Sequence, residues 1–127
     1  MEFSMYYCSQ CNKNIEVFGD SNVNLCCNTK LEKIIPNSQD ASLQKHIPVI
    51  SIQGNDILVE VGAIQHPMSD NQHISTIYVV TDDNCVFRKE LKTSDIAKFT
   101  CNICDANKVD VYAYCNLHGL WTSSYTR

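Results

Sequence analysis

The chain lacks the apolar runs, basic clusters and leader pattern that mark several protein classes. No apolar stretch approaches the ~18 residues of a membrane span. Lysine and arginine form no long run and the formal charge is −4, which disfavours a nucleic-acid or anionic-membrane partner. The first residues contain no basic stretch followed by an apolar one, so no signal peptide is expected. We therefore expect a soluble cytoplasmic protein.

Helical periodicity is also absent over any stretch of three turns. From residue 46 onward, short runs of β-branched and aromatic residues alternate with turn formers. Several short strands at this spacing indicate an all-β sandwich or barrel. The predicted strands are 47–52, 57–64, 74–81, 85–91, 97–103 and 109–115.

Cysteine, by contrast, is abundant, with eight residues in 127. A secreted chain with this content would be expected to form a disulfide framework, whereas a chain without a leader favours metal ligands and free thiols. The segment 1–36 holds four of the cysteines and few apolar residues, so a metal is expected to supply its cohesion. We predict a metal-held module at 1–36 and a β-domain at 37–127, with a linker at 36–40 and a helical turn at 41–45.

The N-terminal cysteines form two pairs. Cys8 and Cys11 form a C-x-x-C knuckle, in which backbone N–H groups can point at sulfurs that bind one ion. Cys26 and Cys27 can complete a tetrahedron, although adjacent residues should distort it. Iron and zinc both suit such a site. The alternative is two unrelated pairs of buried thiols.

Histidine is scarce, and its positions are informative. His118 follows Cys115 by three residues, so a thiolate and an imidazole can reach one ion. This mixed donor set suits iron or zinc better than magnesium or calcium. A single histidine is more often an ordinary polar residue, but all four flank predicted strand ends: His46, His66, His73 and His118.

Four segments together resemble the desulfoferrodoxin family of two-iron superoxide reductases. They are KHIPV at 45–49, HPM at 66–68, HIS at 73–75 and YCNLHGLW at 114–121. The N-terminal cysteine pairs resemble the first iron centre of that family, so the resemblance covers almost the whole chain. It implies a rubredoxin-like iron module followed by an immunoglobulin-like β-sandwich that carries a second iron.

The resemblance also implies the roles of individual residues. The first iron would be held by Cys8, Cys11, Cys26 and Cys27. The second would have an axial thiolate, four equatorial imidazoles and a position open to superoxide, with ligands Cys115, His46, His66, His73 and His118. Lys45 would attract the anion and assist protonation. Superoxide would be reduced by one electron to hydrogen peroxide, with a rubredoxin-like electron donor and a homodimeric assembly.

The fourth imidazole is where the chain departs most from the family pattern. The expected histidine position holds Gln72, and His73 is its neighbour. Either Gln72 takes the ligand position and His73 points away, as strand neighbours do, or the loop 69–72 brings His73 into place. We favour His73 as the ligand because a site short of one imidazole would bind iron less well.

Other departures are smaller. Gln44 replaces a glutamate that caps oxidised iron, so no carboxylate-capped resting state is expected. Asn12 and Asn28 stand where glycines usually follow the cysteine pairs, and asparagine tolerates left-handed backbone.

Three further cysteines, Cys85, Cys101 and Cys104, lie outside these motifs. They can fill small spaces in the sandwich. Cys101 and Cys104 could instead form a redox pair or third metal site, which would require a bulge because strand residues three apart face opposite sides. Two other functions also remain open: an electron carrier or redox sensor with a degenerate histidine site, and a zinc-stabilised interaction module.

Overall fold

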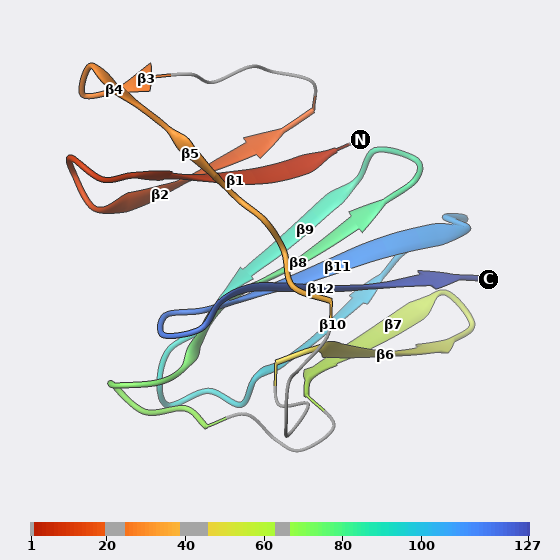
Figure 1. Cartoon of the computed structure of the whole chain (residues 1–127). Helices are drawn as coiled ribbons and strands as arrows, with labels where there is room; N and C mark the ends of the chain where they lie inside the picture. Colours follow the sequence, from red (N-terminus) through yellow and green to blue (C-terminus); the bar gives the residue numbers. More distant parts are fainter. Residues whose placement is uncertain (1, 20–24, 39–45, 63–66) are drawn as a thin grey trace. The chain divides into compact units, whose positions relative to one another are not determined.

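The computed structural model describes most of the chain, and the structural statements below concern that part only. The described ranges are 2–19, 25–38, 46–62 and 67–127. Every regular element within them is a β-strand, which confirms the predicted all-β class (Figure 1). No helix in these ranges is long and apolar enough to cross a membrane. The predicted helical turn at 41–45 lies outside the described residues.

Two compact units make up the chain, Met1–Ile35 and Pro36–Arg127. In the first unit, β1 lies between β2 and β5 in one sheet, while β3 and β4 form a separate hairpin. These strands were not predicted from the sequence, and three of them have only two or three residues. Their bounds are β1 (Phe3–Cys8), β2 (Lys13–Phe18), β3 (Leu25–Cys26), β4 (Thr29–Lys30) and β5 (Glu32–Ile34).

The second unit is a β-sandwich of a three-stranded and a four-stranded antiparallel sheet, in the orders β10-β7-β6 and β12-β11-β8-β9 (Figure 1). Six of its strands were predicted to within a few residues, whereas β12 was not. Their bounds are β6 (Pro48–Gln53), β7 (Asp56–Val61), β8 (Ile74–Thr81), β9 (Val86–Glu90), β10 (Lys98–Asn102), β11 (Lys108–Cys115) and β12 (Gly119–Thr126).

The core of the second unit follows the two-residue period of its strands. Alternate residues of β7, β8 and β11 point between the sheets and are fully buried, among them Ile57, Val59, Ile77, Val79 and Val111. Cys115 belongs to the same cluster, at the end of β11. The core therefore anchors one residue of the Cys115–His118 motif directly.

An irregularity in the β8–β11 ladder changes which side chains face this core. Tyr114 pairs with Thr76 but Cys115 pairs with Ile74, so Ser75 is an extra residue on β8. Ile77 and Val79 are both core residues, and strict alternation from them would place residue 75 in the core. The extra residue places Ile74 there instead.

We expect Ile77→Ala to lower the free energy of unfolding of the second unit by about 2–5 kcal/mol, since it leaves a cavity in a close-packed core. Urea unfolding followed by the fluorescence of Trp121, the single tryptophan, measures this change. Ile96→Ala is the control, because Ile96 is 60% exposed, and we expect a change within about 0.5 kcal/mol. Equal effects of the two substitutions would contradict the proposed core.

Candidate metal centres

The four N-terminal cysteines lie together. Their sulfurs all fall within 4.8 Å of one another. Two of the separations are 3.9 Å, between Cys11 Sγ and Cys26 Sγ, and 3.7 Å, between Cys26 Sγ and Cys27 Sγ. A tetrahedral ion with metal–sulfur bonds of about 2.3 Å separates its sulfurs by about 3.8 Å. The donor set and its spacing therefore fit an iron or zinc ion.

Tight turns bring these cysteines together. Cys8 ends β1, and the residues up to Asn12 reverse the chain into β2. Cys26 pairs with Thr29 across a two-residue turn, in which φ is 54° at Cys27 and 57° at Asn28. Two consecutive left-handed residues are typical of a type I′ hairpin turn.

The asparagines that follow the cysteine pairs do adopt left-handed backbone. Asn12 has a φ of 55° and Asn28 of 57°, as expected from the sequence. Asparagine tolerates this region better than most residues, so it supports both turns without glycine.

Hydrogen bonds set the order in which these thiols ionise. The backbone N–H of Cys11 lowers the pKa of Cys8 to about 7, although desolvation opposes it. Hydrogen bonding to Cys8 raises the pKa of Cys11, and that of Cys26 to about 12. Cys8 therefore supplies a thiolate near neutral pH while Cys11 and Cys26 keep their protons. Because a metal must displace those protons, it binds more tightly as the pH rises.

A second group forms at one end of the sandwich. His46 lies just before β6, Cys115 ends β11, and His118 lies in the turn that leads into β12. One ligand atom from each falls within 4.8 Å of the other two. Cys115 is 0% exposed, whereas His118 is exposed, so the group joins a buried sulfur to an accessible imidazole.

The spacing in this group also fits a metal ion. Nε2 of His46 lies 2.9 Å from Nδ1 of His118, and Cys115 Sγ lies 3.9 Å from the same Nδ1. Two nitrogens bound at right angles with bonds of about 2.1 Å lie about 3.0 Å apart. Nδ1 of a histidine carries either one hydrogen or one lone pair, so it cannot satisfy several hydrogen-bond partners at once. The crowding is instead what ligands around a shared ion would show.

Trp121 contacts both His46 and His118. Its ring stacks on that of His46 at 4.7 Å with an interplanar angle of 16°. Its Nε1–H donates a hydrogen bond of 3.2 Å to the carbonyl of His118. One aromatic side chain on β12 thus fixes the plane of one imidazole and the backbone of the other.

Gln72 and His73 precede β8 at the same end of the sandwich. Nε2 of Gln72 lies 3.4 Å from Nδ1 of His118. Nδ1 of His73 lies 2.9 Å from the carbonyl oxygen of Ser69, and His73 is not part of the group of His46, Cys115 and His118. His66, Lys45 and Gln44 lie outside the described residues.

Asn116, which was not predicted as a functional residue, contacts the loop before β8. Its side-chain oxygen accepts a hydrogen bond of 2.8 Å from the backbone N–H of His73, and its side-chain nitrogen donates one of 3.2 Å to the carbonyl of Asn71. These partners lie more than 40 residues away in sequence, as 43 positions separate His73 and Asn116. No local pattern could have indicated the contact.

The remaining cysteines do not form a third group among the described residues. Cys101 packs against the core, whereas Cys104 is exposed with a φ of 51°. The sequence alternative of a third metal site at Cys101 and Cys104 therefore has no support in their placement. Cys85 is exposed in the β8–β9 turn rather than filling a space in the core.

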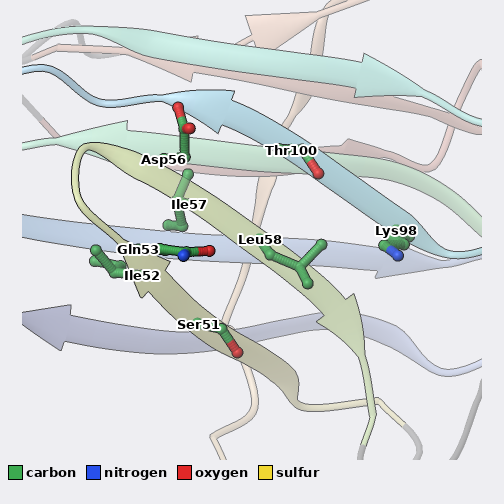
Figure 2. A pocket seen from close by; sticks show the side chains of 8 residues that line it. All are labelled: Ser51, Ile52, Gln53, Asp56, Ile57, Leu58, Lys98 and Thr100. Atoms are coloured by element: carbon green, nitrogen blue, oxygen red, sulfur yellow. The ribbon is translucent and has the colours of Figure 1, made fainter.

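A pocket over the three-stranded sheet is chemically different from both groups. Figure 2 shows its lining side chains on β6, β7 and β10, and none is a cysteine or histidine. The lining residues are Ser51, Ile52, Gln53, Asp56, Ile57, Leu58, Lys98 and Thr100. It offers no soft ligand for iron.

Comparison with known proteins decides the family. The Desulfoferrodoxin family model matches residues 38–124. The chain belongs to the desulfoferrodoxin family. A relative described as a desulfoferrodoxin homolog, from Archaeoglobus fulgidus, is 38% identical over 120 residues and covers 94% of each chain. Desulfoferrodoxin of Desulfarculus baarsii is 35% identical over 118 residues, with 92% of each chain covered.

Solved structures agree with this family. The superoxide reductase from Treponema pallidum superposes with a TM-score of 0.74 at 25% identity, covering 96% of this chain and 97% of its own. The predicted β-sandwich and the resemblance to desulfoferrodoxin are thereby confirmed. The family binds iron, and the four-cysteine group and the histidine–cysteine group are consistent with two iron sites.

We expect Cys8→Ser to remove the four-cysteine centre and leave the histidine–cysteine centre intact, because serine cannot replace a thiolate ligand. Iron content should fall from about two to about one per chain. Metal analysis with visible spectroscopy measures both changes. Cys85→Ser is the control, since Cys85 is exposed and outside both groups, and an equal loss of iron from this variant would contradict the assignment.

We expect Cys101 to react slowly with iodoacetamide near neutral pH. Burial, with a smaller contribution from the Asp56 carboxylate, raises the pKa of Cys101 to about 11. Only the thiolate reacts, so labelling should increase about tenfold per pH unit between pH 8 and pH 10. Peptide mass spectrometry compares it with the exposed Cys104. Rapid labelling of Cys101 at pH 8 in the folded protein would refute its half-buried placement against the core.

Proposed function

We propose that this protein is a superoxide reductase that acts at the histidine–cysteine centre. The observation that carries the proposal is the convergence of His46, His118 and the Cys115 thiol at an accessible end of the sandwich. Its relatives add support. A Pyrococcus furiosus relative described as superoxide reductase is 27% identical over 115 residues, covering 70% of this chain and 93% of its own.

The arrangement of the side chains suits a small anionic substrate. Iron bound by these side chains would supply the one-electron reduction of superoxide, and two protons would complete hydrogen peroxide. His118 is exposed, so solvent and a small anion reach this side of the group. Cys115 is buried in the core, which shields its sulfur from water and from oxidation.

The stacked and hydrogen-bonded side chains keep the group in place. Trp121 holds the plane of the His46 ring and the backbone of His118, so both imidazoles would keep their places around a bound iron. Restricting ligand motion in this way is what positioning residues around a metal do.

Several parts of the proposal come from the family resemblance. His66 is proposed as a further imidazole ligand and Lys45 as the residue that attracts superoxide by its positive charge. The four-cysteine group is proposed to hold the other iron, which the family resemblance assigns as the first centre. The rubredoxin-like electron donor, the homodimer and the cytoplasmic location stay predictions.

We expect the reduced protein to be oxidised by a superoxide pulse with a rate constant of about 10⁸–10⁹ M⁻¹s⁻¹, near the diffusion limit. Pulse radiolysis with optical detection measures it. Cys115→Ser should abolish the thiolate-to-iron absorption of the oxidised histidine–cysteine centre and leave the spectrum of the four-cysteine centre unchanged, because the two groups share no residue.

Cys104→Ser is the matched control, since Cys104 is exposed and belongs to neither group. Its oxidation rate and spectrum should equal those of the unmodified protein. A histidine–cysteine centre that contains iron yet is not oxidised by superoxide would refute the reductase, and would favour an electron carrier that uses the four-cysteine centre.

A further inference from the structure

The side chains of Gln72 and His73 diverge at the edge of the histidine–cysteine group. The carboxamide of Gln72 reaches to 3.4 Å from Nδ1 of His118. The ring of His73 turns back on its own loop, with Nδ1 at 2.9 Å from the carbonyl of Ser69. The polar end of Gln72, and not a nitrogen of His73, therefore lies beside the atoms that would hold the metal.

Hydrogen bonds to the backbone of Gln72 and His73 hold the two side chains in these orientations. Two hydrogen bonds join Asn116 and His73. The backbone N–H of His73 donates to the side-chain oxygen of Asn116 at 2.8 Å, and the backbone N–H of Asn116 donates to the carbonyl of His73 at 3.2 Å. On the other side, Ser69 closes the turn by donating its N–H to the carbonyl of Gln72 at 2.9 Å and accepting from the N–H of Gln72 at 3.3 Å. Exchanging the two side chains would require breaking these bonds.

The extra residue in β8 explains why the ring of His73 turns away from the histidine–cysteine group. Ser75 shifts the alternation, so that Ile74 faces the core beside its partner Cys115. His73, next to Ile74, then lies off that face, in agreement with the contact of its ring with Ser69. Gln72 lies in the turn before β8, from which its carboxamide reaches His118. Strict alternation from Ile77 would have given the opposite result and placed His73 on the face of Cys115.

We propose that Gln72, rather than His73, is a ligand of the histidine–cysteine centre and offers its carboxamide oxygen to the iron. The two ends of a carboxamide exchange by rotation about one bond, so the oxygen can occupy the place of the nitrogen. This inference rests on the iron centre of the proposed function and specifies its ligand set.

A carboxamide oxygen makes this a weaker iron site. Neutral carbonyl oxygens suit hard ions such as magnesium and calcium, whereas imidazole suits iron. A ferrous ion bound here would therefore be held by fewer strong donors, and the Gln72 oxygen would be replaced by water more readily than an imidazole. With Gln72 as a ligand, the affinity of the site for iron would be lower and the metal would be more accessible to solvent.

Two reciprocal substitutions test the assignment on the full iron-loaded chain. Gln72→His should shift the thiolate-to-iron absorption band and slow the loss of iron to a chelator by about tenfold or more, because it adds an imidazole. Gln72→Leu should speed that loss several-fold. His73→Gln should leave both the band and the rate within about twofold, because this ring faces Ser69.

The band is assigned to this centre by its disappearance in Cys115→Ser, and circular dichroism checks that each variant is folded. Loss of the band in His73→Gln, or an unchanged band and iron-loss rate in Gln72→His, would overturn the inference. Neither readout uses superoxide. A protein that shows the expected pattern yet fails to react with superoxide would refute the proposed function alone.

Discussion

The antiparallel ladder between β8 and β11 determines the geometry of the histidine–cysteine centre. It buries Cys115 in the core and places the loop before β8 against the turn that carries His118. Its single irregularity, at Ser75, places Ile74 in the core beside Cys115. A metal site that depends on an exact register is therefore held by the most extensively paired strands of the sandwich.

The two centres are stabilised in different ways. The four-cysteine group lies on tight turns of a unit with few buried side chains, namely Phe3, Met5, Cys8, Val17 and Leu31. Cohesion there has to come largely from the metal itself. The histidine–cysteine group instead rests on a continuous core, so its ligands stay close together through packing. Loss of metal should consequently affect the fold of the first unit far more than that of the second.

Local sequence patterns predicted the features formed by residues close together in the sequence. The C-x-x-C knuckle, the adjacent cysteines and the three-residue spacing of Cys115 and His118 were visible directly, as were six strands of the sandwich. The strands of the first unit were not predicted, and three of them have only two or three residues. The contacts of Asn116 join residues more than 40 positions apart, so no local pattern shows them. They also could not choose between Gln72 and His73, because the extra residue at Ser75 has no signature in the sequence.

The chain enters the second unit along the edge of β12. Asn37 forms a parallel bridge with Trp121, donating its N–H to Leu120 and accepting from the N–H of Thr122, each at 2.9 Å. A bare edge strand invites pairing with another molecule, which leads to aggregation. Asn37 occupies backbone groups of β12 beside Trp121, so these groups are not available to pair with a strand of another molecule. A shortened protein that retains only the sandwich should therefore begin before Asn37 if it is to remain dispersed at high concentration.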